Sequence, residues 1–244
     1  MLAVILGTSL RSIVDDAAFG EPIVTPFGTT SSSLVQTEIF GPRVVVLARH
    51  GNDGTVYAHT VNYRANLWAL KDYGIQQVLA TATVGGISSK LGIGDVVIPD
   101  QIVDYTYGRE HTYFGDLPVK HYDFTYPFTD RLRQILIQAR KGAENSEDLN
   151  RGTYGCTQGP RLETGAEIIR LKRDGCDLVG MTLMPEASLA RELNLDYAAV
   201  CLVVNTAAGL AQSEIDLKHA HTVATSSIET LREHLGRAVK LLDQ

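Results

Sequence analysis

Four side chains able to bind an oxyanion follow strands that the sequence predicts. They are Thr8, then Arg49 and His50, and then Thr83, after the apolar runs at residues 2–6, 44–48 and 78–82. An arginine presents a fixed fork of N–H donors to a phosphate-like anion, and hydroxyls and glycine-rich backbone add further donors. Because ligands bind at strand ends in open α/β sheets, these groups are expected to converge. Taken singly, each is as typical of a turn or a surface charge.

Residues 155–190 hold a second set of polar groups at the ends of short elements. An amphipathic segment with Ala166, Ile169 and Leu171 on one face precedes a short apolar strand, and another helix begins near Pro185. The side chains at element ends are Glu163, Met181, Thr182 and Glu186, and Asn205 ends a later strand. Element ends can carry ligand contacts, although an ordinary helix–strand–helix unit with a solvated Glu163 explains the pattern equally well.

Alternating strands and helices position these groups and predict an α/β fold. Several predicted strands are continuously apolar, as expected for strands covered on both faces. The predicted strands are at residues 2–6, 44–48, 78–82, 96–99, 178–181 and 198–204, and the predicted helices at 61–73, 129–140, 186–193 and 222–242. A hairpin is expected over residues 36–48, with Gly41-Pro42 between its strands, so the sheet is expected to be mixed.

Composition limits the classes of protein and partner. The 244 residues are enough for one large domain, predicted over residues 1–244, and the net charge of −6 argues against nucleic acid or an anionic membrane as the main partner. Three widely spaced cysteines favour a reducing compartment, and the apolar start lacks a basic flank and a cleavage site. A cytoplasmic protein is therefore expected. None of the His, Cys and Asp residues has the spacing of a metal site.

Three motifs resemble the trimeric nucleoside phosphorylase family: GPRLETGAE, VGMTLMPE and VNYRANLWAL. They begin at residues 159, 179 and 61, and the similarity runs from Val4 to about Gly209. The resemblance implies a mixed, partly barrel-like sheet flanked by helices. It also implies phosphorolysis of purine nucleosides, with inorganic phosphate as co-substrate, a homotrimeric assembly, and no metal or organic cofactor.

The resemblance assigns a role to each candidate side chain. The positions expected to bind phosphate are Thr8, Arg49, His50, Thr83 and Thr182. Met181 is expected to contact the ribose, although a methionine there is equally typical of a core position. Glu163 and Asn205 are expected to contact the purine and to carry catalysis. The neutral amide of Asn205 can donate a hydrogen bond to N7 and can orient to suit O6 of the purine. The carboxylate of Glu163 can accept a hydrogen bond from N1–H of a 6-oxopurine.

Departures from the family pattern indicate the substrate class. Relatives specific for adenine have a serine at the position of Glu163 and two aspartates spaced like Asn205 and Ala207, which this chain lacks. A 6-oxopurine substrate is therefore expected. Many relatives also have a further histidine soon after the Arg-His-Gly motif, where this chain has Asn52-Asp53-Gly54. His59 is a candidate to occupy that space.

The group at the 5′ carbon of the ribose is expected to contact histidines. His121 matches a segment that in relatives reaches a neighbouring subunit's site, and His219 and His221 match the segment lining the 5′ pocket. The compact chain and the segment at residues 59–68 resemble the methylthio branch of the family, whereas Glu163 and Asn205 resemble its oxopurine branch. The resemblance therefore implies S-methyl-5′-thioinosine as the substrate. A general inosine or guanosine phosphorylase and a non-catalytic nucleoside-binding regulatory protein remain alternatives. A Rossmann dehydrogenase is disfavoured, because Gly7-Thr8-Ser9 is not followed by the later glycines of that motif.

Overall fold

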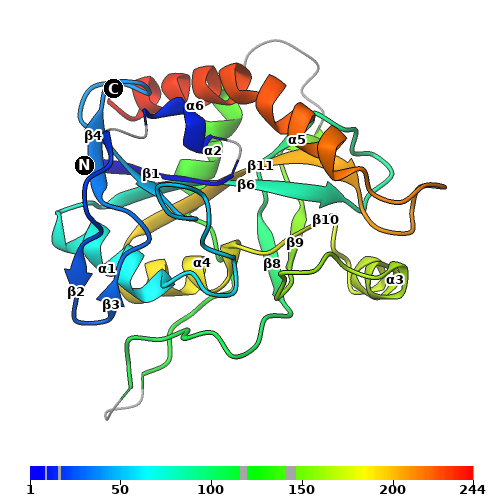
Figure 1. Ribbon diagram of the computed structural model, residues 1–244, viewed down its shortest axis with the longest axis horizontal. Coiled ribbons are helices and arrows are strands. Elements are labelled where there is room, and N and C mark those ends of the chain that lie inside the picture. The colour runs from blue at the N-terminus through cyan, green and yellow to red at the C-terminus, as the bar shows by residue number, and fades with distance from the viewer. Residues whose placement is uncertain (9, 16–17, 116–119, 141–146, 244) are drawn as a thin grey trace.

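The two longest strands, β6 (Gln77–Gly86) and β11 (Asp196–Thr206), run parallel and form the centre of the sheet (Figure 1). The computed structural model describes residues 1–8, 10–15, 18–115, 120–140 and 147–243, so Ser9 lies outside the described residues. Both strands are almost completely buried, in keeping with their continuous apolar sequence.

The remaining strands extend the sheet on both sides of β6. One half of the strand order is β4 (Leu34–Thr37), β5 (Val44–Ala48), β1 (Leu2–Leu6), β6, and the other half continues through β10 (Leu178–Gly180), β9 (Thr153–Cys156) and β8 (Gln101–Asp104). β7 (Val96–Val97) pairs with β11, and β2 (Val24–Thr25) and β3 (Gly28–Thr29) form a separate hairpin.

The predicted mixed sheet is confirmed, because parallel and antiparallel pairs coexist. β1 runs parallel to β5 and β6, whereas β4 runs antiparallel to β5 and β10 runs antiparallel to the end of β6. The expected hairpin is present, and its first strand begins at Leu34, two residues earlier than the sequence indicated. The predicted strand at 96–99 is shorter, since only Val96–Val97 pairs.

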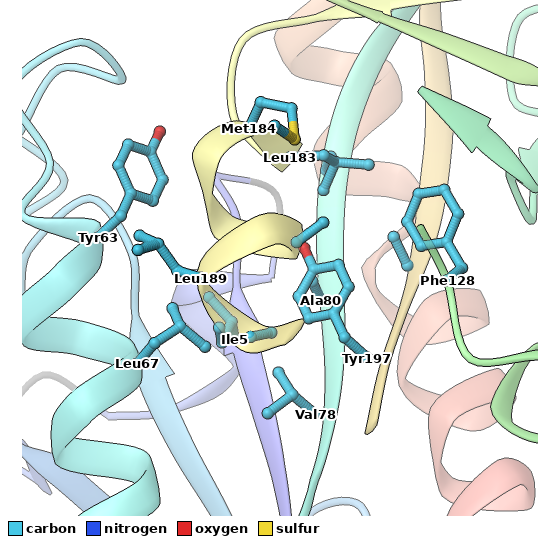
Figure 2. Packing of buried hydrophobic residues seen from close by; sticks show 14 of the residues in the cluster. Ile5, Tyr63, Leu67, Val78, Ala80, Phe128, Leu183, Met184, Leu189 and Tyr197 are labelled. Carbon is cyan, nitrogen blue, oxygen red and sulfur yellow. The ribbon is translucent and has the colours of Figure 1, made fainter. Parts of the chain in front are cut away.

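Helices cover both faces of the sheet (Figure 1). α2 (Asp130–Gln138), α5 (Leu217–Ser226) and α6 (Ile228–Leu242) pack on one face, and α1 (Tyr63–Asp72) and α4 (Leu183–Glu192) pack on the other. Within the described residues, 3₁₀ helices span Arg11–Ile13 and Glu147–Leu149. Figure 2 shows Leu67 of α1 and Leu189 of α4 between their helices, near Ile5 of β1. None of the described helices is both long and apolar enough to cross a bilayer.

Two helical predictions need correction. The predicted helix at 222–242 is two helices that meet at Ser227, and the first begins earlier because the Asp216 side chain accepts hydrogen bonds from the amides of Lys218 and His219. In α3 (Gly165–Arg173), Ile168 and Leu171 form the buried face, whereas Ala166 and Ile169 are exposed.

Candidate active site

Most of the predicted site residues line one cavity of about 410 Å³ at the ends of β1, β5, β6, β10 and β11. They are Thr8, Arg49, His50, Thr83, Glu163, Met181, Thr182, Asn205 and His221. His121 and His219 do not line this cavity, and both are exposed. The cavity therefore brings the candidate phosphate groups and the candidate purine groups of one chain into a single space.

Arg49 is held at the cavity by a buried ion pair. Its Nε and Nη2 atoms donate to the two carboxylate oxygens of Glu186, at 2.7 and 2.8 Å, and its Nη1 donates to the carbonyl of Thr81 at 2.7 Å. Both charged side chains have no solvent exposure. Burial alone lowers the pKa of the guanidinium, but its attraction to Glu186 outweighs burial and leaves that pKa raised. Arg49 is therefore a permanent cation with a fixed orientation.

Close backbone packing brings Thr8 next to this cation. The amide of Gly7 donates to the Thr81 hydroxyl at 2.8 Å, and the same hydroxyl donates to the carbonyl of Ile5 at 3.2 Å. A Cβ atom on Gly7 would lie 2.6 Å from the Thr81 carbonyl oxygen and 3.3 Å from Nη1 of Arg49. Only glycine lets the chain after β1 pass this close to β6.

Thr182 presents a buried hydroxyl that the protein does not satisfy. Its Oγ1 has no hydrogen-bond partner among the described residues, and the side chain makes no capping bond at the start of α4. The residue is 8% exposed and lines the cavity, while its amide donates to the Tyr154 hydroxyl at 3.2 Å. Buried polar groups are normally paired, so this hydroxyl is arranged for a ligand in the cavity.

His50 is held as a neutral imidazole. Its Nδ1 lies 2.8 Å from the carbonyl of Val56, which can only accept, so Nδ1 carries the proton. Burial, followed by the neighbouring Arg49 cation, lowers the pKa of His50 below its usual value. Its Nε2 is consequently a hydrogen-bond acceptor, suited to an anion that still carries a proton.

Glu163 is oriented by a neighbouring threonine. The Thr157 hydroxyl donates to its Oε1 at 2.5 Å, and Glu163 precedes Thr164, which caps α3 in a reciprocal capping box with Glu167. The cap fixes where α3 begins and therefore where Glu163 projects. A carboxylate has acceptor capacity beyond one such bond, so Glu163 can accept a further N–H from a ligand.

A bulge in β11 directs Asn205 into the cavity. The pairing with β6 shifts register between Val203 and Asn205, which leaves Asn205 opposite Gly85. Bulges beside active sites commonly change which way a side chain points. The Nδ2 of Asn205 donates to the carbonyl of Thr206 at 2.8 Å, which leaves its second N–H and its Oδ1 for a ligand.

The apolar part of the cavity has no signature in the sequence. It is formed by one loop and by the region of α5, through Val56, Tyr57, Ala58, Ile215, Leu217, Ala220 and Ala224. Tyr57 and Leu217 are each 64% exposed, so this end opens to solvent. These side chains carry no chemistry that a motif could reveal, and only the meeting of two distant segments makes them a surface.

The segment Asn52-Asp53-Gly54, where the chain departs from the family pattern, forms a turn at the cavity. Gly54 lines the cavity, and Asp53 turns back to accept hydrogen bonds from the amide and hydroxyl of Thr55. His59 does not line the cavity; its ring stacks on Tyr57, with centroids 5.9 Å apart. The described residues contain no group of three His, Cys, Asp or Glu side chains arranged to hold a metal ion.

Comparison with known proteins identifies relatives over nearly the whole chain. Residues 2–240 match the model of the phosphorylase superfamily. The chain is 47% identical over 220 residues, 89% of each protein, to the probable S-methyl-5′-thioinosine phosphorylase of Pseudomonas syringae pathovar tomato. It is 38% identical over 230 residues to the 6-oxopurine nucleoside phosphorylase of Pyrococcus furiosus, covering 91% of this chain and 84% of the relative.

Solved structures agree with this relationship. Methylthioadenosine phosphorylase from Schistosoma mansoni, in complex with adenine, superimposes with a TM-score of 0.88 at 33% identity. The superposition covers 99% of this chain and 91% of the other. The expected fold class, a mixed sheet flanked by helices as in nucleoside phosphorylases, is therefore confirmed.

Proposed function

Because the chain belongs to the phosphorylase superfamily, we propose that it converts S-methyl-5′-thioinosine and phosphate to hypoxanthine and 5-methylthioribose 1-phosphate. The observation that carries this proposal is the single cavity that contains Arg49, Thr182, Glu163 and Asn205. One part of it suits an anion and another suits a purine, as a reaction between phosphate and a nucleoside requires.

The proposed chemistry is a displacement at C1′ of the ribose. A phosphate oxygen forms a bond to C1′ as the bond from C1′ to N9 breaks, and the purine leaves with the electron pair. Arg49, Thr8 and Thr182 hold the phosphate beneath the ribose, where its negative charge stabilises an oxocarbenium-like transition state. Nε2 of His50 accepts a hydrogen bond from a protonated oxygen of the phosphate, and the hydroxyl of Thr83 donates one. Phosphate is the co-substrate, and the proposal requires no metal or organic cofactor.

The purine is expected to be a 6-oxopurine. Hypoxanthine presents N1–H as a donor, and the carboxylate of Glu163, already oriented by Thr157, accepts it. Asn205 stabilises the charge that develops at N7 as the glycosidic bond breaks. Adenine presents a lone pair at N1, which an ionised Glu163 repels.

The open end of the cavity favours a methylthio group at the 5′ carbon. The apolar side chains of Val56, Ile215 and Leu217 lie there, and Met181 lines the wall beside the expected ribose position. A methylthio group gains by leaving water for such a surface. His221 also lines the cavity and can donate to a 5′ hydroxyl, which supports inosine as a second candidate substrate.

The proposal includes a cytoplasmic homotrimer in which His121 of one subunit completes the cavity of another. In support, His121 is exposed and lies outside the cavity of its own chain, and the rim residues Tyr57 and Leu217 are exposed in a single chain. His121→Ala is then expected to lower activity without unfolding the protein. A fully active monomer in sedimentation analysis would refute this part.

The decisive experiment compares four nucleosides with one purified sample. We expect phosphate-dependent release of hypoxanthine from methylthioinosine with a higher kcat/KM than from inosine, and much slower turnover of methylthioadenosine and adenosine. Equal or better turnover of inosine would select the general phosphorylase instead. Tight nucleoside binding without any turnover would indicate a non-catalytic binding protein.

A further inference from the structure

Arg109 is a buried cation behind the cavity, which it does not line. Its guanidinium donates to the backbone carbonyls of Met181 at 2.8 Å, Met184 at 2.6 Å, Thr157 at 3.2 Å and Gln158 at 2.8 Å. Its Nε donates to the side-chain oxygen of Gln158 at 3.0 Å. Within the described part of the chain it forms no ion pair with a carboxylate, so carbonyl dipoles solvate its charge.

The four carbonyls belong to the two segments that carry the site. Met181 and Met184 bracket Thr182, whose unpaired hydroxyl faces the cavity. Thr157 is the residue whose hydroxyl orients Glu163. One planar side chain therefore connects the backbone of the phosphate end with the backbone of the purine end, although these segments follow different strands, β10 and β9.

A third segment of the cavity wall is connected through Tyr63. The guanidinium carbon of Arg109 lies 5.6 Å from the centre of the Tyr63 ring, and Nη1 lies 3.4 Å from its hydroxyl oxygen. That hydroxyl donates to the carbonyl of Ala58 at 2.9 Å, within the loop that forms the apolar wall. Arg109 thus contacts Tyr63, the residue that holds the loop containing Tyr57 through the carbonyl of Ala58.

We propose that Arg109 is a positioning residue that sets the spacing between the phosphate groups and the purine groups of the cavity. The proposal rests on the proposed phosphorolysis and adds a residue to it. A guanidinium suits this task because its N–H donors have fixed, planar directions, whereas a lysine has one flexible ammonium group. Nη1 of Arg109 bonds one segment and Nη2 bonds the other, and the single nitrogen of a lysine keeps the charge but cannot occupy both positions.

The test compares Arg109→Lys with Arg133→Lys. Arg133 is a matched control because it also donates to two backbone carbonyls, those of Pro99 and Asn150, and it does not line the cavity. We expect R109K to lower kcat/KM for methylthioinosine by about 100-fold, the effect of moving reacting groups by roughly 1 Å. In R109K the KM values for phosphate and nucleoside should both rise. R133K should have a Tm similar to that of R109K and should keep the wild-type kinetic constants.

Binding measurements supply a readout that a purely structural role would not change. Calorimetry with inorganic phosphate and with hypoxanthine should give weaker binding of each to folded R109K. Gln158→Met removes the side-chain acceptor of Arg109 Nε and of the Tyr107 amide but keeps the four backbone carbonyls. It should change both constants in the same direction by less, and it provides the answer if R109K does not fold. Wild-type constants in folded R109K, or in Q158M when R109K is unfolded, would overturn the proposal.

Failure of the proposed function is separable from failure of this inference. If the wild-type protein does not release hypoxanthine from methylthioinosine, the proposed function is wrong, and binding of phosphate and hypoxanthine still tests Arg109. If the wild type turns over and R109K equals R133K in every constant, Arg109 has no positioning role.

Discussion

Arg49 and Glu186 form a two-pronged ion pair from which solvent is fully excluded. The Tyr197 hydroxyl donates to the same carboxylate at 2.7 Å, so Glu186 is satisfied from two elements. Since Glu186 lies in α4 and Arg49 follows β5, the pair also connects a helix to the end of the sheet that holds the cavity. The cation of the proposed phosphate site is therefore positioned by a residue that does not itself line the cavity.

Glu186→Gln should weaken both folding and phosphate binding. The amide replaces one acceptor with a donor that faces Arg49, and a buried charge without its partner destabilises a protein by about 3–5 kcal/mol. Urea unfolding and the KM for phosphate measure the two effects. Glu229→Gln, which removes an exposed ion pair with Arg232, should change neither.

Arg49 itself can be tested through the same constant. Arg49→Ala should raise the KM for phosphate, because the charge-assisted contact is lost. A phosphate dependence equal to that of the wild type would exclude Arg49 from the site and leave it with a structural role.

Stability should fall as the pH drops below about 6.5, the usual pKa of histidine. Burial lowers the pKa of both His50 and His234 in the folded state, so below 6.5 the unfolded chain binds more protons than the folded one. The free energy of unfolding then decreases as the pH falls, until the lowered pKa values are reached. Urea titrations at several pH values measure the slope.

Single variants show which histidine causes the pH dependence of the free energy of unfolding. His234→Gln should flatten it without changing phosphate kinetics, because His234 packs between α6 and α2 and bonds the Leu136 carbonyl at 2.7 Å. His219→Gln, on an exposed residue, should leave the slope unchanged. An unaltered slope in H234Q would show that His234 does not contribute to it.

Thr182→Val and Thr81→Val should have opposite effects on the Tm of the protein. The Thr182 hydroxyl has no partner in the described protein, so valine should preserve or raise the Tm while weakening phosphate binding. The Thr81 hydroxyl bonds both Gly7 and Ile5, so its loss should lower the Tm. Thermal unfolding and phosphate titration of both variants decide the matter, and a destabilised T182V with normal phosphate binding would contradict it.

The strands were predictable because β1, β5, β6, β10 and β11 are largely apolar runs that need burial on both faces. The buried face of α3 was predicted wrongly, although the spacing contains it. Ile168 and Leu171 are three residues apart and share a helix face, whereas Ile169 and Leu171, two apart, do not. Gly155 of β9, where a Cβ would lie 3.0 Å from Leu171, permits the close approach of α3 to the sheet.

The residues in and around the candidate site also include some that the sequence could predict and some that it could not. Residues at strand ends, such as Arg49 and Asn205, were predictable because strand ends mark ligand sites. Arg109 was not, since in the sequence it stands between Gly108 and Glu110 and is typical of a solvated loop. Its partners are backbone carbonyls, which have no sequence signature. The role of Glu186 was hidden too, because its partner lies 137 positions away.

The purine specificity should depend on Glu163 and Asn205 together. An ionised Glu163 pairs with N1–H of hypoxanthine and faces a lone pair at N1 of adenine, and an unpaired buried polar group costs roughly 1–3 kcal/mol, more when it is charged. A site built on such pairing can discriminate by about 10⁴-fold. Wild-type protein should therefore have a far higher kcat/KM for methylthioinosine than for methylthioadenosine, and a preference for methylthioadenosine would contradict both assigned roles.

Asn205→Asp should lower the ratio of kcat/KM for methylthioinosine to kcat/KM for methylthioadenosine. It should also lower the turnover of methylthioinosine. The new carboxylate can accept from the 6-amino group of adenine, but it loses the bond from Nδ2 to the Thr206 carbonyl and sets two oxygens against each other. Adding Glu163→Ser removes the charge that faces N1 of adenine, so the double variant should narrow the ratio further. The measurement is kcat/KM for methylthioinosine over methylthioadenosine in the wild type and in both variants. Thr206→Ala, which keeps the backbone carbonyl, is the matched control and should leave the ratio unchanged. A wild-type ratio in the double variant would mean that other residues select the base.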